Sequence, residues 1–260
     1  MDLDDHAIEV FLEVYGTLSR AGPGADEHTL RALDALPGAT PQAVLDLGCG
    51  PGAQTLALAG ALPDAHVLAL DLLPTLVATA EDRVNAAGVG ERVEVVVGDM
   101  AAAPVEPASQ DLIWCEGAIY FLGVAEALRT WRPLLRPGGA VAFTEPIWLV
   151  DEPDAEVCDW WLSNYPALTD DPGVRNQVEA AGFRTVDSFP LPASAWWDEY
   201  YEPMLDRIDE LRERRPDDPV AHEVIGAAEA EIDFHRRFSD QYSYAFYVVE
   251  PATAVMSSPR

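Results

Sequence analysis

A glycine-rich segment that directly follows a hydrophobic run is the most informative part of the sequence. Residues 44–52 read Val-Leu-Asp-Leu-Gly-Cys-Gly-Pro-Gly, so that Gly48, Gly50 and Gly52 follow the run. Glycine lets the backbone approach a ligand closely, and a helix that begins there presents free N–H donors. This pattern predicts a nucleotide site beyond the carboxyl end of a strand.

The acidic residue before the loop bears on which nucleotide binds. Gly48, Gly50 and Ala53 also satisfy the dinucleotide pattern of NAD-binding folds. Asp46 would repel a pyrophosphate, but it suits the cationic amino group of a methionine moiety. The alternative is that Asp46 accepts hydrogen bonds from the loop and holds the turn, and both roles remain open.

Two further acidic residues stand at predicted strand ends. Asp71 ends the second strand about 20 residues after the loop, where a carboxylate accepts from both ribose hydroxyls. Leu72, the next residue, is assigned to the same site. Asp99 ends the third strand, where it is placed to accept from the adenine amine with Met100 against the ring; a purely structural cap is the alternative.

The elements that must position these residues alternate between strands and helices, which predicts an α/β fold with a parallel sheet. Two helices, within residues 1–20 and 26–36, come first. The predicted strands are 43–47, 66–71, 92–97, 111–115, 140–145, 183–189 and 242–249, and the predicted helices between them are 53–62, 75–87, 124–135 and 174–181. Residues 190–238 are predicted to be mostly helical.

These motifs resemble those of class I S-adenosylmethionine-dependent methyltransferases, and the resemblance covers nearly the whole chain. It also extends to a bacterial subgroup of small-molecule methyltransferases. The residues that carry it are 46–52, Asp71, Asp99 and 135–139 for the family, and 20–24, 111–120 and 242–247 for the subgroup.

The resemblance implies one Rossmann-like domain over residues 1–260. Its seven-stranded sheet would be mostly parallel with an antiparallel last strand, and S-adenosylmethionine would be the cofactor. The N-terminal helices, within residues 1–36, would fold over this cofactor, with Tyr15 and Arg20 closing the site and Arg20 on the methionine carboxylate. The alternatives are helix packing for Tyr15 and a solvated helix end for Arg20.

The end of the fourth strand is where such enzymes place the acceptor. Methyl transfer from a sulfonium is an in-line displacement, so that the protein mainly aligns donor and acceptor and removes a proton where necessary. Glu116 and Tyr120 are the best-placed catalytic candidates, with Glu145 at the end of the fifth strand behind them. Cofactor or substrate binding, or structural hydrogen bonding, are the other roles considered for Glu116. The Pro-Pro-aromatic and Pro-Cys motifs typical of nucleic-acid methyltransferases are absent.

Two insertions, 146–172 and 190–240, are predicted to form a cap above the sheet. They hold many aromatic residues, which suit an aromatic or apolar acceptor, or an amine held near Glu116 and Glu145. The alternative is that most of these rings pack the cap itself. The aromatic residues are Trp148, Trp160, Trp161, Tyr165, Trp196, Trp197, Tyr200 and Tyr201.

Composition excludes several classes of function. The 16 basic residues, all arginine, against 45 acidic ones give a net charge of −29, which argues against a nucleic-acid partner. No apolar run is long enough for a membrane span and no signal peptide is evident, so a cytoplasmic protein is expected. The five histidines and three cysteines lack ligand spacing, so no metal is expected. The missing lysine and the negative charge indicate a GC-rich genome or adaptation to high salt.

The sequence therefore predicts transfer of a methyl group from S-adenosylmethionine to a small organic acceptor, with nitrogen or oxygen favoured. The alternatives are an NAD(P)-dependent oxidoreductase and a non-catalytic protein that binds S-adenosylmethionine. The oligomeric state is left open.

Overall fold

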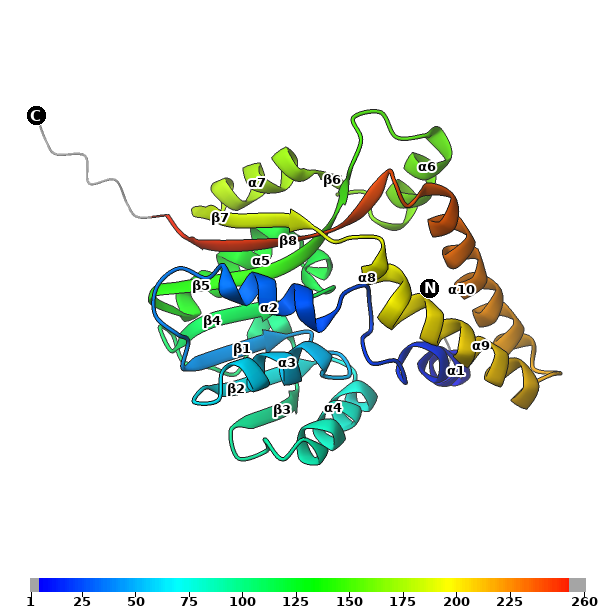
Figure 1. Cartoon of the computed structure of the whole chain (residues 1–260), viewed down its shortest axis with the longest axis horizontal. Coiled ribbons are helices and arrows are strands. Elements are labelled where there is room, and N and C mark those ends of the chain that lie inside the picture. Colours follow the sequence, from blue (N-terminus) through cyan, green and yellow to red (C-terminus); the bar gives the residue numbers. More distant parts are fainter. Residues whose placement is uncertain (1–4, 253–260) are drawn as a thin grey trace, which may run out of the picture.

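One sheet organises the computed structural model, which describes residues 5–252 (Figure 1). Its strands follow the order β3-β2-β1-β4-β5-β8-β7, and the short β6 pairs with β5. All pairs among the first five strands are parallel, whereas β8 is antiparallel to both β5 and β7. The predicted mostly parallel sheet with an antiparallel last strand is confirmed. The strands are β1 (Ala43–Leu47), β2 (His66–Asp71), β3 (Val93–Val97), β4 (Gln110–Cys115), β5 (Leu135–Trp148), β6 (Thr169–Asp170), β7 (Phe183–Pro190) and β8 (Tyr242–Pro251).

Helices cover both faces of this sheet, because alternate strand residues are apolar on both sides. On one face, α2 (Asp26–Asp34), α3 (Ala53–Ala61) and α4 (Pro74–Ala86) pack against Val44, Val67 and their neighbours. On the other face, α5 (Val124–Trp131) and α7 (Asp171–Ala180) pack against Leu45, Leu47 and Val141. The sheet is therefore held between two apolar layers.

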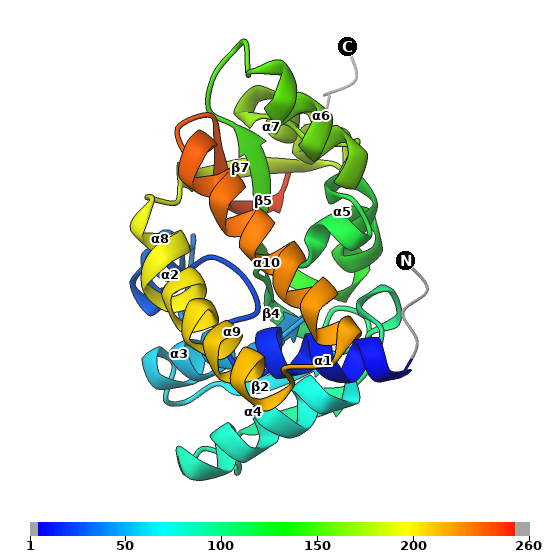
Figure 2. The same cartoon turned by 90° about the vertical axis from the view of Figure 1, so that its right-hand side faces the viewer.

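A second group of helices lies beyond the carboxyl ends of the strands (Figure 2). These helices share a separate apolar core, to which α1, the segment 196–211 and α10 contribute most of the buried side chains. We call this group the cap. Its elements are α1 (Asp5–Tyr15), α6 (Ala155–Asn164), α8 (Ser194–Trp196), the π-helical turn η4 (Trp197–Tyr201), α9 (Glu202–Arg214) and α10 (Pro219–Phe238).

The structure differs from the predicted elements mainly around β5. The predicted helix 124–135 ends at Trp131 and continues as a short 3-10 turn, η3 (Arg132–Leu134), because Pro133 cannot extend the helix. β5 begins at Leu135, before the start of the predicted strand 140–145, and residues 136–139 form a bulge inside it, between the pairs Gln110–Leu135 and Leu112–Ala140. The helix α6 and the strand β6 lie in the stretch for which the sequence predicts no regular element.

Over the described residues, no helix combines the length and the apolar character that crossing a membrane requires.

Candidate active site

The glycine loop between β1 and α3 is held tightly against β2. The amides of Gly48 and Cys49 both donate to the carbonyl oxygen of Leu70, at 2.8 and 2.9 Å. Gly48 has a φ of +75°, and a Cβ there would lie 2.5 Å from the Cβ of Ala118. The loop therefore needs glycine at this position for its backbone angle and for its close approach to the segment after β4.

Asp71 fastens the loop to the end of β2. One carboxylate oxygen, Oδ2, accepts from the amide of Gly50 at 2.9 Å, and Oδ1 accepts from the amide of Leu73 at 2.9 Å. Each oxygen keeps a second lone pair for a ligand. Asp71 thus orders the loop as well as facing the space beside it.

A cavity of about 660 Å³ opens directly beside this loop. At one end it is lined by the loop and the ends of β2 and β3; at the other end it is lined by α1, the segment after β4, η4 and α10. Its size falls in the usual range of small-molecule sites. Of the predicted site residues it brings together Tyr15, Arg20, Gly48, Gly50, Asp71, Leu72, Asp99, Met100, Glu116 and Tyr120.

Three predicted residues do not line this cavity, and the first is Asp46. The side chain of Asp46 is fully buried, and it lies on the same face of the sheet as Val44. This face is covered by α3, and Asp46 Oδ2 accepts a hydrogen bond from the hydroxyl of Thr55 at 2.6 Å. Oδ1 has no hydrogen-bond partner among the described residues. Burial raises the pKa of Asp46 to about 7. Asp46 therefore lies outside the cavity lining, and its predicted contact with the cofactor stays a prediction.

Gly52 and Glu145 are the other two predicted residues outside the cavity lining, and their predicted roles stay predictions. Gly52 faces α4, where a Cβ would lie 3.0 Å from the Cβ of Ala80, so it is small for the sake of helix packing. Glu145 is buried behind the cavity, and its Oε1 accepts from the hydroxyl of Tyr165 at 2.6 Å. Burial raises the pKa of Glu145 to about 8.

Arg20 joins four parts of the chain at the edge of the cavity. Its guanidinium donates to Glu116 at 3.1 Å, to Glu199 of η4 at 3.1 Å and to Asp26 of α2 at 2.6 Å. Only 4% of the Arg20 side chain is exposed. Arg20 is therefore a buried, ion-paired residue and not a solvated helix end.

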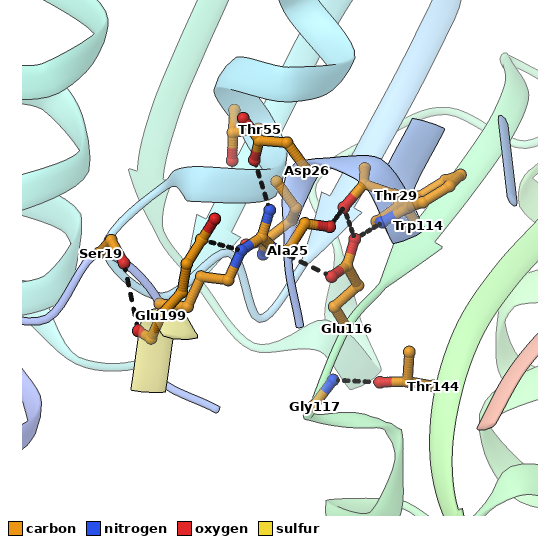
Figure 3. Close-up of polar contacts among 12 residues, drawn as sticks. Ser19, Ala25, Asp26, Thr29, Thr55, Trp114, Glu116, Gly117, Thr144 and Glu199 are labelled. Carbon is orange, nitrogen blue, oxygen red and sulfur yellow. Dashed lines mark hydrogen bonds and ion pairs between the residues drawn. The ribbon is translucent and has the colours of Figure 1, made fainter. Parts of the chain in front are cut away.

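Glu116 is hydrogen-bonded through both oxygens (Figure 3). Oε1 accepts from the hydroxyl of Thr29 at 2.7 Å and from the indole N–H of Trp114 at 2.8 Å, while Oε2 accepts from Arg20. Burial raises the pKa of Glu116, although Arg20 opposes the shift. These contacts hold Glu116 in place at the cavity, and its predicted catalytic or binding role stays a prediction. The backbone continues into the amide of Gly117, which donates to the hydroxyl of Thr144 at 2.7 Å.

Tyr120 and Tyr15 face the cavity with their rings. Burial raises the pKa of Tyr120 to about 12, so that the phenol stays protonated near neutral pH. Tyr120 packs edge-on against Tyr165 and beside Phe121, whereas Tyr15 stacks on Phe11 of α1. The two tyrosines come from opposite sides, one from the N-terminal helix and one from the segment after β4.

The remaining predicted residues stand at the strand ends. Asp99 accepts from the amide of Ala101 at 2.8 Å, and thus caps the 3-10 turn η1 (Met100–Ala102) while it lines the cavity. Leu72 is 67% exposed, so it contributes an accessible apolar surface to the rim. Both predicted ligand contacts stay predictions.

Most of the aromatic residues in the two insertions pack the cap. All eight belong to its apolar core or lie against it, and of these eight only Tyr200 lines the cavity. Apart from Tyr200, the aromatic rings of the two insertions therefore pack the cap and do not line the cavity.

The main residue that the sequence analysis missed is Glu231 of α10, which lines the cavity from the cap side. The helical spacing of apolar residues in the sequence could have indicated Glu231. The buried face of α10 includes Ala228, Ile232 and His235, and Glu231 lies beside that face, one residue before Ile232. An acidic residue next to an apolar helix face is a candidate site residue, because charged side chains are seldom buried without a partner.

In the described part of the chain, no three His, Cys, Asp or Glu side chains gather in a way that could hold a metal ion.

Comparisons with known proteins agree with this geometry. Residues 44–139 match the family model "Methyltransferase domain". The chain is 29% identical over 249 residues to trans-aconitate 2-methyltransferase of Streptomyces avermitilis, covering 90% of this chain and 86% of the relative. It is 34% identical over 137 residues to malonyl-[acyl-carrier protein] O-methyltransferase of Dechloromonas aromatica, covering 48% and 47%. The chain spans less than half the length of the curated relatives that it matches at 34–38% identity.

A solved structure has nearly the same fold over almost the whole chain. It is an S-adenosylmethionine-dependent methyltransferase from Geobacter sulfurreducens in complex with S-adenosylhomocysteine, with a TM-score of 0.82 at 24% identity, covering 94% of this chain and 98% of that one. Residues 44–139 thus match a methyltransferase domain, and the chain shares the fold of a solved S-adenosylmethionine-dependent methyltransferase.

Proposed function

We propose that this protein transfers a methyl group from S-adenosylmethionine to a small organic acceptor, at nitrogen or oxygen. The observation that carries the proposal is the single cavity that runs from the glycine loop to the aromatic wall of the cap. A donor bound at one end and an acceptor at the other would meet inside it.

The residues at the loop end fit this donor. Gly48 and Gly50 keep the loop free of side chains, Asp71 has lone pairs left for ribose hydroxyls, and Asp99 with Met100 stands where the adenine would lie. When bound, S-adenosylmethionine supplies a methyl group activated on a sulfonium. The chain's own part is to align the two molecules and to exclude water.

The cap end suits a small acceptor. Phe11, Leu12 and Tyr15 of α1 and Tyr200 of η4 enclose it from the cap, and Tyr120 lines it from the segment after β4. During transfer the acceptor lone pair forms the new bond to the methyl carbon, and the pair of the broken C–S bond stays on sulfur. Where the accepting atom carries a proton, a base or water takes up that proton.

Titration calorimetry with S-adenosylmethionine, S-adenosylhomocysteine and NAD tests the proposal. We expect the first two to bind and NAD not to bind. Asp71→Ala should weaken both about tenfold or more, because it removes the ribose acceptor and loosens the loop. NAD binding without the other two would favour an oxidoreductase. Tight cofactor binding without turnover on any acceptor would favour a non-catalytic binding protein.

A further inference from the structure

Glu231 is a part-buried carboxylate that lines the cavity from the cap side. Its Oε1 accepts from the hydroxyl of Tyr201 at 3.1 Å and from that of Tyr200 at 3.5 Å. Oε2 has no hydrogen-bond partner among the described residues, and the residue lines the cavity. The two tyrosines therefore orient the carboxylate and leave one oxygen for something else.

No cation of the described chain neutralises this carboxylate. None of the ion pairs within residues 6–250 includes Glu231. His235, one turn along α10, lies against Tyr201 and has its pKa lowered to about 4 by burial, so it is neutral near pH 7. Among the described residues that line the cavity, Arg20 is the one basic residue, and it is bound to three other carboxylates.

The surroundings of Glu231 are aromatic as well as acidic. Tyr15, Tyr120 and Tyr200 line the same cavity, and each contributes a ring from a different element. The face of an aromatic ring attracts a cation, most strongly where water is excluded. A buried carboxylate without a cation is costly unless a ligand supplies one.

We propose that Glu231 binds a cationic amine carried by the methyl acceptor, with tyrosine rings around it. This inference rests on the proposed function and names the class of substrate. It also separates this chain from an enzyme for carboxylate acceptors, because an anion would face Glu231 with no free arginine to receive it.

Calorimetry on the full chain saturated with S-adenosylhomocysteine tests the proposal. The probes are two matched series: phenethylamine, 2-phenylethanol and phenylacetate, and butylamine, butanol and butyrate. We expect the amine of at least one series to bind about tenfold tighter than its alcohol and its carboxylate. Equal binding within both series, or a preference for the carboxylates, overturns the proposal without any variant.

Two glutamine variants then assign the effect to one residue. Glu231→Gln should weaken binding of the preferred amine about tenfold and leave the affinity for S-adenosylhomocysteine unchanged. Glu223→Gln is the matched control, because Glu223 is an exposed glutamate on the same helix. Retained amine preference in Glu231→Gln overturns the proposal.

A further readout separates amine binding from two other roles of Glu231. If the carboxylate instead faced the sulfonium, Glu231→Gln would weaken S-adenosylmethionine but not S-adenosylhomocysteine, and amines would be unaffected. If it were structural, the variant would melt below the parent. We expect an equal or higher Tm, because the amide oxygen still accepts from the tyrosines and an unpaired charge is gone. Failure of the parent to bind either cofactor would refute the proposed function itself.

Discussion

At the scale of single residues, the buried acids of this protein differ in what surrounds them. Asp46 has one hydroxyl partner, Glu116 has three donors including an arginine, and Glu231 has only tyrosine hydroxyls. Burial raises the pKa of all three. Of these three, Glu116 is paired with an arginine, Asp46 lies outside the cavity lining, and Glu231 lines the cavity without a basic partner among the described residues.

Gly48→Ala tests the close approach of the glycine loop. Gly48 and Gly88 both have positive φ values, +75° and +69°, so alanine is strained at either site. Only at Gly48 would the new Cβ meet a neighbour, Ala118, whereas nothing lies within 4 Å at Gly88. We expect Gly48→Ala to lower the free energy of unfolding by about 1–3 kcal/mol more than Gly88→Ala, measured by urea denaturation. Equal losses would show that the contact is unimportant.

The raised pKa of Asp46 predicts a pH dependence of stability. The folded-state pKa is about 7, against 3.8 as the ordinary value. Between these values the folded protein keeps a proton that the unfolded chain has lost, so raising the pH through this window lowers stability. Relative to Asp46→Asn, the parent should lose on the order of 2 kcal/mol of unfolding free energy between about pH 5 and 8. A difference that stays flat with pH would contradict the assignment.

At the scale of elements, Arg20 connects the N-terminal segment to three others. Its partners lie on α2, at the end of β4 and in η4, so one side chain joins the sheet to the cap. Ser19 and Leu18 reinforce this link, since their carbonyl oxygens accept from Arg83 of α4. The segment before α2 is therefore held over the cavity from two sides.

Arg20→Ala should destabilise the protein strongly. The pair with Glu116 is buried on both sides, with 4% and 8% of the side chains exposed, so the variant leaves an unpaired buried carboxylate. We expect a loss of about 3–5 kcal/mol in unfolding free energy by denaturant titration. The double variant Arg20→Ala with Glu116→Gln should recover part of it.

Arg129→Ala is the control for this prediction. Arg129 pairs with Glu126 on the surface, at 3.5 Å, and about half of its side chain is exposed. This variant should change stability by less than about 1 kcal/mol. A similar effect of both variants would mean that the buried ion pairs of Arg20 add no more to the free energy of unfolding than a surface ion pair does.

At the scale of the whole molecule, the net charge of −29 is the dominant feature. With 45 acidic residues against 16 arginines, most carboxylates have no basic partner, and their mutual repulsion opposes the folded state. Repulsion between exposed charges is screened by salt over distances of about 10 Å at 0.1 M and less at higher concentration.

We therefore expect the Tm to rise by about 5 °C or more between low salt and about 1 M sodium chloride. Differential scanning calorimetry measures this directly. An uncharged solute of equal osmolality serves as the control, because it does not screen charge. A Tm that stays constant or falls with salt would refute adaptation to high salt.

The local part of the site is predictable from residues that are close together in the chain. The strand, the glycine turn and the helix at 43–61 depend on neighbouring residues, and so do the strand-end positions of Asp71 and Asp99. Hydrophobic periodicity and glycine chemistry act over such short distances. The antiparallel last strand followed from the family resemblance, not from the residues alone, and the strand order came only from the structure.

Contacts between side chains that are distant in the sequence depend on how the chain folds. The pleat of β1 turns Asp46 toward Thr55 and away from the cavity, and the same fold leads Glu145 to Tyr165. Arg20 and Glu199 are 179 positions apart in the chain, yet they bind each other. Glu231 reaches the cavity only because the cap core packs α10 over the strand ends. Such contacts depend on the burial of distant apolar faces, which no local pattern specifies.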